Sequence, residues 1–235
     1  LLLLPDQDVW LRSMRSVFSA KTNMTRKQRF SHIISWFTEN MPQAETELVF
    51  KDPYQLLVAV ILSAQCTDKR VNSITPAFFR RFPDVNALAE ASQDEVFELI
   101  KSCSYPNNKA KHLNEMAKTL CNTFQGIVPS DVEELITLPG VGRKTAHVIA
   151  SVAFNQAKMA VDTHVFRVSN RMGLAVKATT PLAVEKQLVQ YIPEGLIHKA
   201  HHWLILHGRY VCKARNPMCS ACGVSAYCKF YQQLQ

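Results

Sequence analysis

The sequence has no apolar run long enough to cross a membrane. Its longest, Leu56–Ala64, is about half of the ~20 residues that a transmembrane helix requires. A secretory signal is not expected either, because the leucines that open the chain have no basic segment before them and no small-residue cleavage site after them. Met24 begins a basic amphipathic stretch that is typical of a natural start. Residues 1–23 are therefore expected to form an N-terminal extension, native or not.

The sequence also has almost no strand-like alternation, no internal repeat and no low-complexity tract. Apolar residues recur instead at helical spacing, with proline and glycine at the joints between segments. Two capping boxes, Ser92 with Glu95 and Ser130 with Glu133, mark helix starts. These features predict an all-α fold. The expected helical segments are Pro53–Cys66, Val71–Phe82, Glu95–Cys103, Lys109–Phe124 and Thr145–Phe154.

Acidic residues are in the minority. Asp and Glu number 19 against 27 Lys and Arg, which gives a formal charge of +8 and a pI of about 9.2. A basic balance suits a polyanionic partner such as nucleic acid, although many basic proteins bind nothing acidic. The hydrophobic fraction is 47% over 235 residues, enough to fill the core of one large domain or two small ones.

The seven cysteines are unevenly distributed, with three lying singly in apolar stretches and four crowded near the C-terminus. Their number is odd and no secretory signal is expected. We therefore predict a reducing compartment, three core thiols and one metal-binding group rather than disulfides. The single cysteines are Cys66, Cys103 and Cys121, and the group is Cys212, Cys219, Cys222 and Cys228.

The motif LPGVG at residues 138–142 lies between two predicted helices and is typical of a helix-hairpin-helix. Its two glycines let the backbone turn tightly, so that successive N–H groups at the start of the second helix face one phosphate. Such a hairpin grips the nucleic-acid backbone rather than reading sequence. Alone, the pentapeptide is better explained as an ordinary corner closed by glycine. The binding candidates are Leu138, Gly140, Gly142 and Arg143.

The hairpin motif continues as RKTA at residues 143–146, and VDTHVFR follows at residues 161–167. Together these segments closely resemble the active-site motifs of the endonuclease III family of helix-hairpin-helix DNA glycosylases. The resemblance runs from about Met24 to the end of the chain. It implies a bifunctional DNA glycosylase and abasic-site (AP) lyase of base excision repair, which swings an oxidised or ring-saturated pyrimidine out of duplex DNA, removes it and nicks the strand.

The resemblance assigns Lys144 and Asp162 as the catalytic pair. The lysine amine would attack the sugar C1′, displace the base and leave a Schiff base that permits β-elimination. We expect the site to favour the uncharged amine by desolvation and neighbouring cations, since a free lysine is protonated at neutral pH. Asp162 would stabilise the cationic sugar or move protons. Taken singly, Lys144 also suits a plain phosphate contact and Asp162 an N-cap, and the acid can serve both roles.

The C-terminal cysteines follow the spacing C-x6-C-x2-C-x5-C. Structural zinc usually takes two close pairs, and this run has only one C-x-x-C, so zinc is the second choice. The spacing matches the ligand pattern of the endonuclease III family, which implies a 4Fe-4S cluster held by all four thiolates. The cluster would mainly fold the short C-terminal segment. It would also pin Lys213 and Arg215, on the first loop, where the resemblance implies contacts with DNA phosphates.

Two further segments carry candidate DNA contacts. SAQCTD at residues 63–68 is similar to the family segment whose glutamine fills the hole left by the extruded base, and this role falls on Gln65. By itself, Gln65 would be an exposed polar residue at a helix end. Tyr105 stands where the bacterial pattern commonly has a leucine wedge, and its ring could stack on the orphaned base. This departure puts the opposite-base preference in doubt, not the chemistry.

Histidines supply one candidate contact and one alternative metal site. His164, two residues after Asp162, is a second-tier candidate for touching the base pocket and DNA. His201, His202 and His207 lie in a predicted helix, Lys199–Tyr210, and we interpret them as core or cluster-supporting residues rather than metal ligands.

The combined prediction is a protein of two helical lobes. Residues 46–155 form a bundle with Gln65 and the hairpin, and residues 24–45 with 156–235 carry Asp162 and the cluster; the linkers are Glu45–Asp52 and Asn155–Ala160. The expected partner is double-stranded DNA with damaged pyrimidines or abasic sites, bound by a monomer in the bacterial cytoplasm, at the nucleoid. Three alternatives stay open: a monofunctional adenine-mismatch glycosylase, which would lack Lys144, a non-catalytic DNA-binding module, and an electron-transfer protein.

Overall fold

The computed structural model describes residues 24–235, so the expected N-terminal extension lies outside the described residues. Every regular element in this range is helical, which confirms the predicted all-α class. None of these helices is both long enough and apolar enough to cross a membrane. The α-helices are α2 (Arg26–Asn40), α3 (Pro53–Ser63), α4 (Asp68–Arg81), α5 (Val85–Glu90), α6 (Gln93–Ile100), α7 (Pro106–Phe124), α8 (Val132–Ile136), α9 (Arg143–Phe154), α10 (Thr163–Met172), α11 (Pro181–Val189), α12 (Ile197–Tyr210) and α13 (Lys229–Gln232), and the 3₁₀ turns are η1 (Glu194–Leu196), η2 (Cys219–Ala221) and η3 (Ser225–Tyr227).

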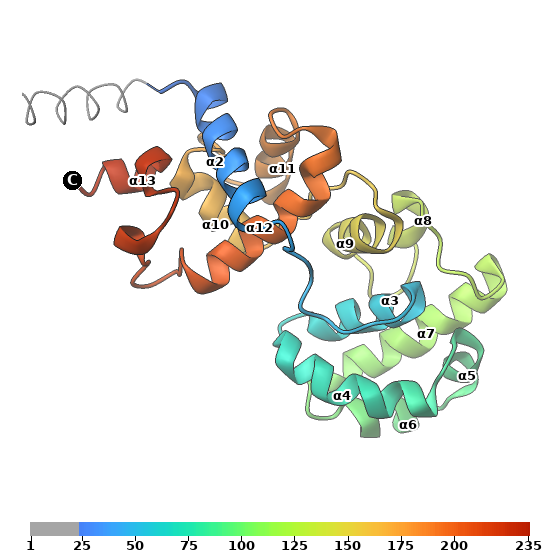
Figure 1. The fold of residues 1–235 in the computed structure, drawn as a ribbon. Helices are drawn as coiled ribbons and strands as arrows, with labels where there is room; N and C mark the ends of the chain where they lie inside the picture. The colour runs from blue at the N-terminus through green and yellow to red at the C-terminus, as the bar shows by residue number, and fades with distance from the viewer. Residues whose placement is uncertain (1–23) are drawn as a thin grey trace, which may run out of the picture. The chain divides into compact units, whose positions relative to one another are not determined.

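The described chain divides into two compact units, each with its own packing (Figure 1). Glu45–Ala160 forms the first, here called the bundle unit. Residues 24–44 together with Val161–Gln235 form the second, here called the cysteine unit. The predicted lobes had similar bounds, at residues 46–155 and at residues 24–45 with 156–235.

The bundle unit has a continuous apolar core. Helix α3 lies at its centre, with eight of its eleven residues buried. It packs against α4, α7 and α9, while α7 also packs against α5 and α6 (Figure 1). The C-terminal end of α3 and the first turns of α7 and α9 carry the candidate site residues of this unit, so the core fixes the segments that present them.

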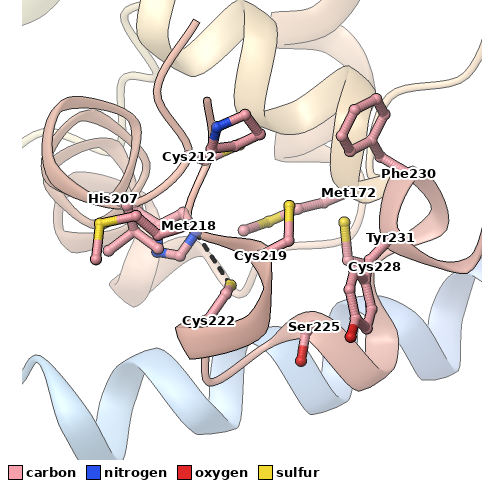
Figure 2. Close-up of a pocket in the computed structure, with 12 residues that line it drawn as sticks. Met172, His207, Cys212, Met218, Cys219, Cys222, Ser225, Cys228, Phe230 and Tyr231 are labelled. Atoms are coloured by element: carbon pink, nitrogen blue, oxygen red, sulfur yellow. Dashed lines mark hydrogen bonds between the residues drawn. The ribbon is translucent and has the colours of Figure 1, made fainter. Parts of the chain in front are cut away.

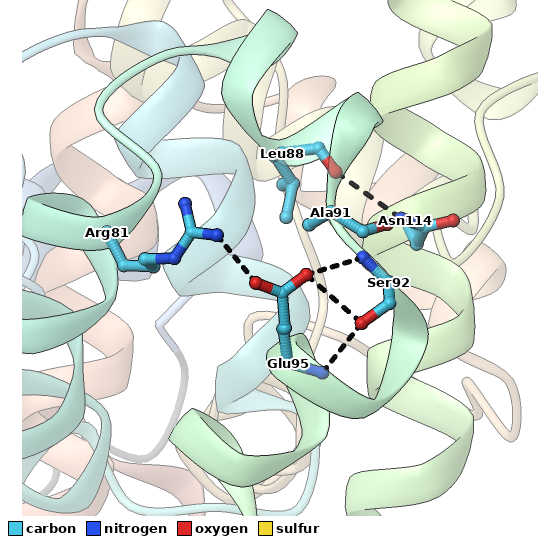
Figure 3. A network of polar contacts seen from close by, with 6 residues as sticks. All are labelled: Arg81, Leu88, Ala91, Ser92, Glu95 and Asn114. Carbon is cyan, nitrogen blue, oxygen red and sulfur yellow. Dashed lines mark hydrogen bonds and ion pairs between the residues drawn. The ribbon is translucent and has the colours of Figure 1, made fainter.

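Side-chain caps fix several helix starts in the bundle unit. The predicted Ser92–Glu95 capping box is confirmed, and a Glu95 oxygen also lies 2.6 Å from Arg81 Nη2 (Figure 3). The predicted Ser130–Glu133 box is wrong. Asp131 caps α8 instead, its Oδ1 accepting from the backbone N–H groups of Glu133 and Glu134 at 2.8 and 3.2 Å.

Three predicted helix bounds move in the structure. The apolar segment that was expected to run to Cys66 ends at Ser63, and the next residue but one, Gln65, has a left-handed φ of +54°. Helix α6 ends at Ile100, three residues before Cys103. Helix α7 begins at Pro106 rather than Lys109, because proline at its first position has a φ already suited to a helix.

The cysteine unit combines a packed helical part with a loop-rich end. Helix α10 packs against α11, α12 and α13, and α2 packs against α12, where the rings of Phe37 and Trp203 stack at 5.8 Å. Beyond α12 the chain contains only η2, η3 and the four-residue α13, none of which includes a buried residue. Apolar burial in this last stretch is confined to Val224 and Cys228. The segment therefore has very little apolar core of its own.

Candidate active site and metal centre

The hairpin joins α8 to α9 through residues 137–142. Gly140 has a left-handed φ of +81°, and a Cβ there would lie 2.9 Å from the Cβ of His112, so glycine is required for the turn itself. Gly142 differs, since a Cβ built on it would meet nothing within 4 Å. As N-cap of α9, Gly142 offers no side-chain acceptor to the first amides of the helix. The position is open for an anion to approach the helix N-terminus.

Arg143 and Lys144 are the first two residues of α9, directly after the hairpin. Both side chains are exposed in the described structure. The desolvated setting that we expected for the Lys144 amine is therefore not provided by the free protein. Leu138, the remaining hairpin candidate, is buried and anchors the turn in the bundle core instead of facing outward.

Asp162 is the N-cap of α10 and is half-buried. Its Oδ1 accepts a hydrogen bond from Val165 N at 2.7 Å, so the carboxylate is held rigidly at the start of a helix. This geometry confirms the capping role and leaves the catalytic role as a proposal. His164, also half-buried, lies 3.1 Å from the Arg167 guanidinium through Nδ1 and packs against α12 at Gly208.

The predicted site residues fall in both units. The bundle unit carries the hairpin, Lys144, Gln65 and Tyr105. The cysteine unit carries Asp162, which is the second residue after the boundary at Ala160, together with His164, Lys213, Arg215 and the four C-terminal cysteines.

Gln65 and Tyr105 share an unusual backbone conformation. Gln65 has φ +54° and Tyr105 has φ +55°, in the left-handed region that non-glycine residues seldom adopt. Both side chains are exposed, Tyr105 by 61%. A hydrogen bond of 2.7 Å from Ser104 Oγ to the carbonyl of Gln65 joins the two segments directly. The structure thus brings together, on one surface of the bundle unit, the two residues that were predicted to occupy the space of the extruded base.

The four C-terminal cysteines line one pocket, together with apolar side chains that include Met172, Val211 and Phe230 (Figure 2). Within residues 24–235, no three His, Cys, Asp or Glu side chains meet closely enough to hold a single metal ion. The thiols instead surround a shared hollow. An iron-sulfur cluster requires several thiolates around one volume that apolar groups shield, and the four cysteines surround the pocket in this way.

Neighbouring groups contact the thiols from the packed part of the cysteine unit. His207 Nε2 lies 3.6 Å from Cys222 Sγ, and Arg171 Nη1 lies 3.6 Å from Cys212 Sγ. The same guanidinium donates to the carbonyls of Lys213 and Ala214 at 2.7 and 2.9 Å. Lys213 and Arg215 are exposed on the loop that Arg171 holds in this way.

Burial makes two of the thiols, Cys222 and Cys228, poor anions in the absence of a cation. It raises the pKa of Cys222 to about 11 and also raises the pKa of Cys228. Binding as thiolates would therefore require a strongly cationic centre in the pocket. The donor set and its apolar lining fit an iron-sulfur centre.

Burial confirms the predicted core position of two of the three histidines, and His202 is half-buried. His201 and His207 are buried in α12, close to the buried Trp203. Burial lowers the pKa of His207 to about 4, so the ring is neutral at physiological pH. Sequence reasoning missed Arg171, whose guanidinium reaches three residues of the cysteine loop, and Lys109, described below. A basic residue in the last turn of the helix that starts at Asp162 was the available signal for Arg171.

A match to a known superfamily defines the class of protein to which the chain belongs. A sequence profile of the HhH-GPD superfamily of base excision DNA repair proteins matches residues 58–194, a range that begins within α3 and includes the hairpin and Asp162. The all-helical fold, the hairpin and this match together place the protein among the helix-hairpin-helix proteins of base excision repair.

Relatives narrow the class to a family. Endonuclease III of Rickettsia felis is 47% identical over 204 residues, which cover 87% of this chain and 95% of the relative. Endonuclease III of Synechocystis is 46% identical over 205 residues, covering 87% and 93%. A trapped endonuclease III–DNA covalent intermediate aligns with a TM-score of 0.85 and 39% identity, covering 90% of this chain and 99% of that one. The chain belongs to the endonuclease III family, whose members are DNA glycosylase/AP lyase enzymes, as the sequence predicted.

Proposed function

We propose that the protein removes oxidised or ring-saturated pyrimidines from duplex DNA and nicks the strand through attack by Lys144. The observation that carries the assignment is the position of this lysine. It lies on the first turn of α9, one residue beyond the open hairpin, in a chain of the endonuclease III family. A phosphate held at the hairpin would place the adjoining sugar near the same helix start.

The proposed reaction proceeds in two stages. The neutral Lys144 amine forms a bond to the sugar C1′ while the bond from C1′ to the base breaks, and the base leaves with the bonding electrons and takes up a proton. The attached amine then loses a proton and the C1′–O4′ bond of the sugar ring opens, with O4′ taking up a proton, which gives a Schiff base that permits removal of a C2′ proton and β-elimination of the 3′ phosphate. Because Lys144 is exposed in the free protein, the bound DNA itself would supply the desolvation of the amine.

We assign to Asp162 the stabilisation of positive charge on the sugar and the transfer of protons. Its support is the capping bond from Val165, which fixes the carboxylate without a flexible stem. The cap uses Oδ1, so the second oxygen carries the proposed chemistry. His164 and Arg143 are assigned to DNA contacts beside this acid and beside the lysine, respectively.

Gln65 and Tyr105 are proposed to occupy the space that the extruded nucleotide leaves. Their support is their joint exposure and the direct bond between their segments. Filling this space would offset part of the unstacking cost, which is a few kcal/mol. Lys213 and Arg215 are proposed to contact phosphates from the loop that Arg171 holds.

Cys212, Cys219, Cys222 and Cys228 are proposed to hold a 4Fe-4S cluster. The shared pocket supports this assignment, and thiols that do not converge on one point suit a cluster better than a single zinc ion. When bound, the cluster would supply the cationic centre around which the C-terminal segment folds. We further propose a monomer that acts in the bacterial cytoplasm, at the nucleoid.

The test is incubation of the purified protein with a duplex oligonucleotide that carries thymine glycol, with and without borohydride. We expect nicking without reductant, a covalent protein–DNA adduct with it, and loss of both in Lys144→Ala. Lys118→Ala is the matched control, because Lys118 is also an exposed lysine on a helix of the bundle unit. Binding without nicking would favour a non-catalytic module, and base removal without an adduct would favour a monofunctional glycosylase.

A further inference from the structure

The carbonyl groups at the C-terminal end of α3 have an unusual set of hydrogen-bond donors. The last four carbonyls of a helix have no partner within it and require other donors. Here three of these carbonyls are satisfied locally: Val60 accepts from Ser63 Oγ at 2.8 Å, Ile61 from Ala64 N at 3.4 Å and Ser63 from Cys66 N at 3.0 Å. The carbonyls of Leu62 and Ala64 accept instead from Lys109 Nζ, at 2.7 and 2.8 Å.

Lys109 comes from a different helix and is buried. It lies in the first turn of α7, where its backbone N–H donates to the carbonyl of Tyr105 at 3.2 Å, and only 5% of the residue is exposed. Buried lysines are rare unless they are paired. The partners here are the negative end of the α3 dipole and the two carbonyls just before Gln65. One side chain therefore ties the Tyr105 turn to the Gln65 loop.

Both tied segments hold a strained residue. A left-handed φ costs a residue with a side chain about 1–2 kcal/mol and persists only where the surroundings enforce it. At Gln65 and Tyr105 the enforcing contacts are the Lys109 clamp on one side and the Ser104–Gln65 hydrogen bond on the other. Without the clamp, the buried carbonyl of Leu62 and the partly exposed carbonyl of Ala64 would lose their donor, and the loop would relax toward other conformations.

The charge of Lys109 is not neutralised by an acid. The titratable groups that act on it are the thiols of Cys103 and Cys66, and burial raises the pKa of Cys103 to about 11, so Cys103 is a neutral thiol at physiological pH. Burial also lowers the pKa of Lys109 from its ordinary value. The ammonium thus donates to backbone carbonyl oxygens, as expected of a side chain that fixes the conformation of a loop.

We propose that Lys109 is a positioning residue for base extrusion: its ammonium holds the Gln65 loop and the Tyr105 turn in the conformation that fills the emptied position in DNA. The proposal rests on the function proposed above, in which Gln65 and Tyr105 occupy that position. It assigns no contact with substrate to Lys109 itself. The effect of a change at Lys109 should therefore pass through Gln65.

The test compares two reactions under single-turnover conditions: base removal from a thymine glycol duplex, and nicking of a duplex with a preformed abasic site. Extrusion is cheaper where the target is already unstacked. We expect Lys109→Met to slow base removal by roughly tenfold or more, equivalent to ~1.4 kcal/mol, while nicking at the abasic site changes by less than about threefold. Lys109→Arg, which keeps a cation, should restore much of the loss.

A second readout reports the wedge directly. A 2-aminopurine placed opposite an uncleavable abasic analogue senses the stacking of the orphaned base. Its fluorescence change on protein binding should be lost in Gln65→Ala and in Lys109→Met alike. The double variant should be no worse than the poorer single one, because both changes remove the same contact. Ser104→Ala should weaken the signal in the same direction.

Asn114 provides the matched structural control. It lies on the same helix, is 6% exposed, and caps α5 by donating to the carbonyls of Leu88 and Ala91 at 3.3 and 2.6 Å (Figure 3). Asn114→Leu should lower Tm as Lys109→Met does, yet keep the fluorescence change and the ratio of the two rates.

The outcomes separate the two proposals. Equal loss of both reactions in Lys109→Met, or additive effects with Gln65→Ala, would reduce Lys109 to a structural residue. If Lys109→Met does not fold, Lys109→Gln, which also removes the ammonium, and Ser104→Ala carry the test, and wild-type fluorescence in both would overturn the proposal. A wild-type protein that fails to nick abasic DNA would refute the proposed function instead, whatever Lys109 does.

Discussion

The bundle unit and the last part of the cysteine unit are each stabilised internally by different means. In the bundle unit, long helices bury a continuous apolar core, and α3 alone contributes eight buried residues. In the last part of the cysteine unit, short 3₁₀ turns and a four-residue helix surround a pocket of thiols. Apolar burial is the dominant favourable term in folding, so the second region needs another source of stability. The difference teaches that the bundle unit has an apolar core that follows its sequence pattern, whereas the C-terminal segment has little core and would depend on the cluster proposed for its cysteines.

Removing one thiol tests this difference between the two regions most directly. Cys222→Ala should abolish the bound iron and sulfide and open the segment from Cys212 to protease, because the buried ligand set loses a member. The bundle unit should stay protected. Iron and sulfide analysis, the visible absorbance of the protein and limited proteolysis measure this.

The matching change in the bundle unit is Cys121→Ala, which removes a thiol that lies 3.3 Å from Asn86 Oδ1. Iron content and the protease pattern should not change. A Cys222→Ala protein with full iron content, or zinc in place of iron in the wild type, would contradict the proposed cluster.

The next largest effect is expected from an acid that caps a helix. Asp162→Asn keeps an N-cap of equal quality but removes the charge, so stability should hold while base removal slows by roughly 10²- to 10⁴-fold. Single-turnover rates and Tm measure the two consequences. Asp131→Asn makes the same change at the α8 cap of the bundle unit and should leave the rate unaltered. Full activity in Asp162→Asn would restrict this residue to capping.

Two glycines of the hairpin separate folding from binding within the bundle unit. Gly140→Ala forces a side chain into a left-handed backbone and against His112, so we expect a loss of about 1–2 kcal/mol and a lower Tm. Gly142→Ala meets no protein atom and should fold normally. It should nevertheless weaken DNA binding roughly tenfold, since hydrogen bonds to a charged group contribute about 1.5–3 kcal/mol. Unchanged affinity in Gly142→Ala would mean that phosphate does not approach there.

The smallest effect concerns pH and the bundle unit alone. The backbone N–H of Ser92, then Arg81, lowers the pKa of Glu95 in the folded protein. A lowered pKa gives stability above the unfolded value of about 4.3, and this stability is lost as the pH falls through the folded value. Glu95→Gln should therefore lower Tm slightly at neutral pH, and the difference should vanish in acid. An equal difference at all pH values would point to packing instead of charge.

Much of the fold could be predicted because it depends on local pattern. Apolar periodicity indicated the main helices, and the Ser92–Glu95 box and the hairpin motif depend on residues close in sequence. The Ser130 box failed because a better acceptor, Asp131, stands one residue later. The left-handed Gln65 and Tyr105 were not predictable, since no glycine or asparagine marks them. Lys109 contacts carbonyls 45 and 47 residues away, and only tertiary packing brings them together.

Asp162 caps the start of helix α10, which ends one residue after Arg171, whose guanidinium donates to carbonyls of the loop that follows Cys212. At about 1.5 Å per residue, these ten residues make a stiff rod some 15 Å long. One end of the rod bears the acid and the other is anchored in the thiol pocket. Loosening the anchor would let the rod tilt, so the precision with which the acid is aimed depends on a distant site that takes no part in bond breaking.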